Sequence, residues 1–139
     1  MSPVRVTVRP DPADPLRFYF DFDPVAPGGR GGASIRLDPD IGLVSIDGVH
    51  KNSLLPPRST GGVVADGLLQ TFLPRPTILE AYNVERTTAA TLTAGGDGVG
   101  TRVGQMLEDT ASALGGFVVF WAPISDGNAW HLRVHIAYP

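Results

Sequence analysis

Seven polar side chains stand at or just after the ends of apolar runs that are typical of β-strands. They are Asp21, Asp23, Asp47, His50, Asp66, Asn83 and Glu85. In an open parallel sheet, ligands bind beyond the carboxyl ends of the strands. If these runs are parallel strands, several of the seven side chains meet at one edge and form a site. The alternative is that strands end in polar residues because the chain turns at the surface.

Two of these residues have side chains suited to acid–base chemistry. His50 can exchange a proton near neutral pH and belongs to a polar cluster able to bind an anion. Glu85 lies in the hydrogen-bonding run 83–88 and can orient or deprotonate an acceptor. The alternatives are a solvated loop histidine and a helix cap, for which Thr87 is the other candidate. We predict His50 and Glu85 as the catalytic residues, with both alternatives open.

Other catalytic and metal-binding chemistries lack the residues that they need. The chain has no cysteine, which excludes disulfides, thiolate nucleophiles and cysteine-ligated metals. His131 and His135 share a strand face, but Arg133 between them opposes a cation, so a solvated face of an edge hairpin is the better interpretation and no metal site is predicted. No G-x-S-x-G motif is present. The run 95–104 lacks both nucleotide-loop spacings, and an ordinary glycine-rich turn is favoured over an anion site.

Length and composition indicate one globular domain, 1–139. Apolar residues make up 42% of the chain and charged residues 18%, as in packed domains. The net charge of -3 gives no basic field for nucleic acid. No apolar run is long enough to cross a bilayer and no secretory signal is recognisable. We therefore expect a cytoplasmic protein, or one delivered as part of a larger exported protein, with no membrane partner.

The first part of the chain, 1–59, is predicted to be rich in β-structure. Apolar and polar residues alternate in 4–9 and 16–23, as in strands with one buried face. Prolines between these runs force a turn. Short strands near 34–37 and 43–46 complete this part.

The second part, 60–139, is predicted to be α/β. A buried strand at 63–66 runs into a short helix. A later helix has Thr101 as its cap and ends at Gly115, before a closing hairpin that turns at 125–128. Strands that alternate with helices imply crossovers and a mainly parallel sheet. On this interpretation, two neighbouring parallel strands end in Asp47 and Asp66.

In that order of elements, the chain resembles class I S-adenosylmethionine-dependent methyltransferases. The resemblance rests on Ile46-Asp47, Leu55-Pro56 and the run 59–66, and on the order of elements over 16–139. It implies a Rossmann-like fold and a S-adenosylmethionine or nucleotide site. Acids at the strand ends would hold the cofactor, with one near the adenine and one at the ribose hydroxyls. These cofactor-binding acids are Asp21, Asp23, Asp47 and Asp66.

Two functions follow from the resemblance. The first is a small methyltransferase-like domain, similar to the compact domains of bacterial polymorphic toxins, that acts on an unknown small molecule or protein. The family's first strand leads into a G-x-G loop, and this chain has no glycine between residues 4 and 15. That departure favours the alternative, a non-catalytic interaction module with a degenerate cofactor site. Such a module would act through its hairpin edge or its glycine-rich loops.

Overall fold

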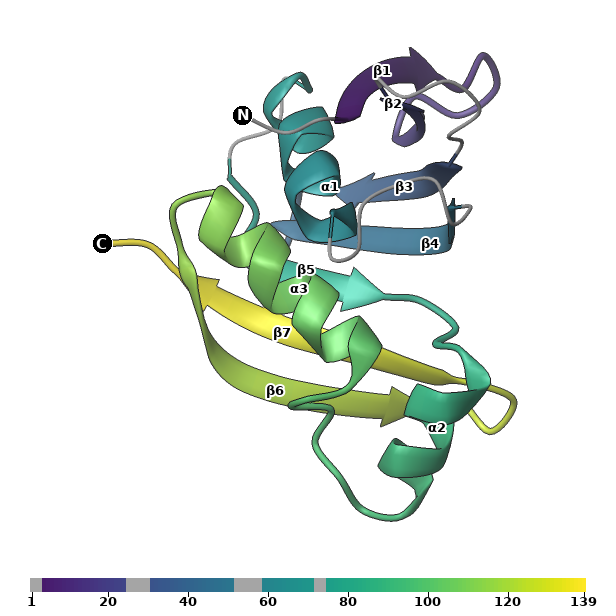
Figure 1. Ribbon diagram of the computed structural model, residues 1–139, viewed down its shortest axis with the longest axis vertical. Coiled ribbons are helices and arrows are strands. Elements are labelled where there is room, and N and C mark those ends of the chain that lie inside the picture. The colour runs from purple at the N-terminus through teal and green to yellow at the C-terminus, as the bar shows by residue number, and fades with distance from the viewer. Residues whose placement is uncertain (1–3, 25–30, 52–58, 72–74) are drawn as a thin grey trace.

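A computed structural model describes residues 4–24, 31–51, 59–71 and 75–139 of the protein (Figure 1). The described part forms one sheet and three helices. The strands are β1 (Val4–Pro10), β2 (Arg17–Pro24), β3 (Gly31–Asp38), β4 (Leu43–Lys51), β5 (Ile78–Ala81), β6 (Phe117–Ser125) and β7 (Trp130–Ala137). The helices are α1 (Thr60–Leu69), α2 (Arg86–Thr93) and α3 (Arg102–Ala113).

The seven strands lie in the order β1-β2-β3-β4-β5-β7-β6. Only β4 and β5 pair in parallel, and every other described pair is antiparallel. The prediction of a Rossmann-like, mainly parallel sheet is therefore wrong. Short connections such as 39–42 join antiparallel neighbours, whereas parallel neighbours need a long crossover. The chain makes one such crossover between paired strands, through α1.

The predicted β-rich N-terminal part is confirmed, and its alternating pattern sets its two faces. Phe20 and Phe22 of β2 pack with Ile35 and Leu37 of β3 in the core. The residues between them point to the opposite face of the sheet. Two ion pairs involve arginines of that face, Arg9 with Asp21 and Arg36 with Asp14. This half of the sheet has one apolar and one polar face, as antiparallel sheets often do.

The predicted strand at 63–66 is instead the middle of helix α1. Val63, Val64 and Ala65 are all buried, so the segment has no alternation, and a short apolar run does not distinguish a buried strand from a buried helix. The helix is covered on two sides, by the sheet and by α3. At its start, Gly61 lets α3 come close, because a Cβ there would lie 2.5 Å from Asp109 Cβ.

Three other predicted features of the C-terminal part are confirmed: the Thr101 cap, the helix end at Gly115 and the turn at 125–128. The Thr101 side chain accepts a hydrogen bond from Gly104 N (3.0 Å) and caps α3. The helix is followed by Gly115 at φ 88°, a left-handed conformation that favours glycine. A turn between Asp126 and Ala129 joins β6 to β7, with Asp126 N donating to Ala129 O (3.2 Å).

Two layers result. Helices α1 and α3 lie side by side over one face of the sheet, and α2 lies beyond one end of β6 (Figure 1). The core fills the space between the helices and the central strands, with Val44, Leu79 and Val134 fully buried. None of the described helices covers the other face.

Candidate functional site

A cavity of about 450 Å³ opens at the carboxyl ends of β4 and β5. These ends lie together because the two strands are parallel, and the starts of α1 and α3 close the other side. The apolar lining is Ile46, Val49, Ala81, Tyr82, Val84, Val103 and Met106. The polar lining is His50, Thr60, Asn83, Glu85 and Arg102. A mostly apolar hollow with a few convergent polar groups is the usual form of a small-molecule site.

The structure brings three of the seven predicted site residues into this cavity. His50 is the next-to-last residue of β4, while Asn83 and Glu85 follow β5. Asn83 and Glu85 are distant in sequence from His50, and the parallel pairing of β4 with β5 brings the three residues to the same cavity. The expectation of a shared strand edge is correct for these three.

Three of the four predicted cofactor acids, Asp21, Asp47 and Asp66, do not line the cavity. Asp21 forms an ion pair with Arg9 on β1. Asp47 alternates with buried Ile46 and so points to the opposite face of the sheet. Asp66 is exposed on α1 and ends no strand. Asp23 belongs to β2, and its side chain lies outside the described part of the structure.

Glu85 is the N-cap of α2, which confirms the capping alternative. Its carboxylate accepts hydrogen bonds from Thr87 N (2.8 Å), Thr88 N (2.9 Å) and the Thr88 hydroxyl. Partial burial raises the pKa of Glu85, but these hydrogen bonds outweigh it and hold the pKa below its ordinary value. A carboxylate that is ionised and already bonded at both oxygens is poorly placed to accept a further proton.

Arg102 is the cavity residue that the sequence did not single out. It is exposed at the first position of α3, and among the described residues no ion pair or side-chain hydrogen bond involves it. It also lines a second hollow of about 480 Å³ between α2 and α3, together with Thr87, Thr91 and Thr101. Arg102 belongs to the glycine-rich run 95–104, whose backbone amides, and not its arginine side chain, are the anion-binding groups that the sequence suggests.

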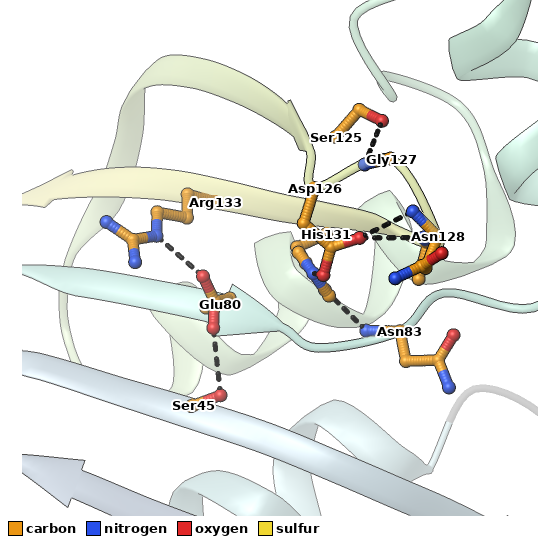
Figure 2. A network of polar contacts seen from close by, with 10 residues as sticks. Ser45, Glu80, Asn83, Ser125, Asp126, Gly127, Asn128, His131 and Arg133 are labelled. Atoms are coloured by element: carbon orange, nitrogen blue, oxygen red, sulfur yellow. Dashed lines mark hydrogen bonds and ion pairs between the residues drawn. The ribbon is translucent and has the colours of Figure 1, made fainter.

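A buried histidine holds the segment that follows β5 (Figure 2). His131 Nδ1 accepts a hydrogen bond from Asn83 N (2.9 Å), so Nε2 carries the proton and donates to Asp126 Oδ2 (2.9 Å). The Tyr82 ring stacks on the imidazole at 4.3 Å between centroids. Asn83 has a left-handed φ of 57°, a conformation that asparagine tolerates better than most residues. The cavity wall formed by residues 82–85 is therefore anchored from β7.

A second polar cluster on the same face has a structural role. Glu80 on β5 is buried and accepts hydrogen bonds from Ser45 Oγ (3.0 Å) and Arg133 Nε (2.6 Å), as Figure 2 shows. The β6–β7 hairpin does lie at one edge of the sheet, with β6 outermost. The predicted solvated face is wrong for β7, because His131 is buried and Arg133 pairs with Glu80.

Comparison with known proteins finds no matching family model, curated protein or solved structure. Within the described residues, no helix is both long and apolar enough to cross a membrane.

Proposed function

We propose that the protein binds a small organic anion with an apolar body in the cavity at the ends of β4 and β5. The observation that carries this proposal is Arg102, a cation without a partner in the described part of the chain, at the rim of a mostly apolar cavity. An anionic group of the ligand pairs with Arg102, and its apolar body packs against Val49, Tyr82 and Met106.

The balance of charge around the cavity supports an anion rather than a cation. The negative charge of Glu85 is compensated by the N-terminus of α2, because its carboxylate accepts hydrogen bonds from the first amides of that helix. Arg102 has the opposite relation to its helix. It stands at the positive N-terminal end of α3, where a cation is disfavoured. The start of α3 therefore adds positive potential beside the guanidinium of Arg102. A bound anion would compensate both of these positive charges.

His50 remains a predicted catalytic residue. It is exposed at the cavity, with Nδ1 3.4 Å from Gly48 O, a distance too long for a strong hydrogen bond. The imidazole is thus available to a ligand, as a hydrogen-bond donor or as an acid–base group. In the binding proposal, His50 supplies a second polar contact opposite Arg102.

S-adenosylmethionine belongs among the ligands to be tested because its carboxylate and its aromatic base suit the cavity, although its ammonium and sulfonium groups make its net charge positive. The resemblance that suggested S-adenosylmethionine depends on a mainly parallel sheet, and the sheet of this protein is mainly antiparallel. S-adenosylmethionine is therefore not favoured over other ligands. Aromatic carboxylates, phosphate monoesters and nucleotides meet the same chemical requirements.

The test is a thermal-shift titration with these anions and with neutral amide analogues of the carboxylates. An anion that binds only the folded state raises the melting temperature by mass action. Arg102→Gln removes a charge-assisted contact and should weaken binding roughly ten- to a hundredfold. Arg86→Gln is the matched control, because Arg86 opens α2 as Arg102 opens α3 but does not line the cavity.

A panel of anions that leaves the melting temperature unchanged at millimolar concentration contradicts the proposal. So does a bound anion whose affinity is the same in the parent and in Arg102→Gln. Met106→Trp provides a second check, since a larger side chain fills the apolar part of the cavity and should reduce binding of every ligand, charged or neutral.

A further inference from the structure

Strand β6 forms one edge of the seven-stranded sheet. It pairs with β7 on one side, from Phe117 to Ser125. Along its other side, the described part of the chain places no strand. The outward N–H and C=O groups of an edge strand are a template for pairing with another chain.

From Phe117 to Ala122, the side chains of β6 include neither a charge nor a proline. The strand, FVVFWAPIS, contains no charged residue. Phe117, Val119 and Phe120 are exposed at 55%, 56% and 58%, and Ile124 at 36%. Exposed apolar residues scattered singly are ordinary, but these four lie on one strand at the sheet edge.

The opposite edge, β1, is protected. Arg5 and Arg9 are exposed on it, and Pro10 ends it, and charged residues and proline are common devices against edge pairing. Gln70, just after α1, also donates from Nε2 to Val6 O (3.2 Å) and occupies a backbone acceptor of the strand. The edge formed by β6 carries no charge, and its proline, Pro123, lies near the end of the strand. The uncharged segment 117–122 is therefore the less protected of the two edges.

We infer that β6 pairs antiparallel with β6 of a second copy of this chain, about a two-fold axis. An uncharged strand can face itself without like-charge repulsion, whereas two β1 strands would bring arginines together. Self-pairing also satisfies the outward backbone groups of both copies at once, as in an isologous interface. A charged partner strand would find no complementary charge on β6.

The position of the axis follows from two irregularities in β6. Pro123 lacks an N–H and so weakens pairing at its end of the strand. The register shifts between Val118 and Phe120, which marks a bulge at Val119. The paired segment is therefore expected within 117–122, with the axis near Val119 and Phe120. This arrangement brings the Phe120 rings of the two copies near each other.

The buried area indicates a weak dimer rather than a permanent one. Two phenylalanines, each more than half exposed, leave on the order of 200 Å² of side-chain surface per copy. Val119 and the edge backbone of the paired segment contribute up to about a similar amount. Two copies then bury about 800 Å², just below the roughly 1,000 Å² of stable specific interfaces. We expect association in the micromolar range.

Sedimentation equilibrium over a wide range of protein concentration tests the inference. The parent should show a monomer–dimer equilibrium, and Phe120→Lys should weaken it at least roughly tenfold by placing like charges at the axis. Val119→Lys is a second variant at the same place. Thr7→Lys, exposed on β1, is the matched control and should leave the dimer intact. Circular dichroism verifies that each variant is folded.

Cross-linking locates the contact. The chain has no cysteine, so Phe120→Cys introduces the only thiol, and mild oxidation should give a disulfide-linked dimer. Ile124→Cys, beyond the paired segment, should cross-link far less. A parent that stays monomeric up to millimolar concentration overturns the inference, and so does a dimer that persists in both lysine variants.

Discussion

At the scale of single residues, the hydrogen bonds of His131 fix its state. Both ring nitrogens are satisfied only when Nε2 carries the proton, because Nδ1 accepts from the Asn83 amide. The partner carboxylate, Asp126, also accepts from Asn128 N (2.9 Å) and Ala129 N (2.8 Å) in the hairpin turn. One carboxylate therefore joins the β6–β7 turn to the imidazole that anchors the cavity wall.

The first prediction concerns the pH dependence of this contact. The hydrogen bond from His131, with those from the two amides, lowers the pKa of Asp126 from 3.8 to about 2. Because the folded state has the lower pKa, the stabilisation is present above about pH 4 and is lost as the pH falls toward 2. Urea unfolding at several pH values should show Asp126→Asn less stable than the parent at pH 6, with the difference shrinking as pH 2 is approached.

Comparison with the variant isolates Asp126, because the other carboxylates titrate equally in both proteins. A difference in unfolding free energy that stays constant from pH 6 to pH 2 would show that the charge of Asp126 does not stabilise the fold.

At the scale of elements, close packing of α1 on α3 depends on one of two adjacent glycines. A Cβ at Gly61 would lie 2.5 Å from Asp109 Cβ and 2.8 Å from Met106 O, while a Cβ at Gly62 would have nothing within 4 Å. Both glycines lie in the first turn of the same helix. They differ only in what they face.

The second prediction uses this pair as a matched experiment. Gly61→Ala should lower the free energy of unfolding by about 1–3 kcal/mol, since the methyl group forces the helices apart. Gly62→Ala should leave it unchanged or raise it by up to about 1 kcal/mol, because alanine is the better helix former. Urea unfolding of both variants measures the two effects.

Equal effects of the two substitutions would mean that backbone conformation, and not the helix–helix contact, governs both sites. The sequence of α1 supports the packing interpretation. It is apolar on nearly all sides and carries its only charged residue, Asp66, on the exposed face.

At the scale of the whole molecule, the sheet is unevenly supported. The central strands β4, β5 and β7 contribute fully buried residues to the core, among them Val44, Leu79 and Val134. Strand β1 contributes only partly buried Val6 and Val8 and lies at the edge. Local stability follows the density of buried contacts, so it should fall from the centre of the sheet toward β1.

The third prediction is a gradient of amide hydrogen exchange. Hydrogen-bonded amides of β5 and β7 should exchange slowest, those of β2 and β3 at intermediate rates, and those of β1 fastest. Hydrogen exchange followed by mass spectrometry or NMR measures this order at neutral pH. Protection of β1 as strong as that of β7 would show that the whole sheet opens in one cooperative step.

Part of the site was predictable from local signals, and part was not. The strand-end positions of His50 and Asn83 placed them correctly at one edge. The run after β5 left open a catalytic Glu85 and a helix cap at Thr87 or Glu85, and the structure shows Glu85 as the cap. Arg102 was missed because the glycine-rich run 95–104 indicates a turn or a backbone anion site and does not show where the arginine side chain lies. Its place at the cavity appears only when α3 brings it to the ends of β4 and β5.

Features whose cause lies within a few residues could be predicted from local sequence: the alternating faces of β1 and β2, the Thr101 cap of α3, and the β6–β7 turn. The helical state of 63–66, the pairing of β5 with β4 and β7, and the mainly antiparallel sheet depend on the packing of the whole fold. Caps, turns and alternation are set by backbone geometry and local hydrogen bonds. Strand order and direction depend on contacts between distant residues, and a short apolar run such as VVA satisfies a buried strand and a buried helix equally well.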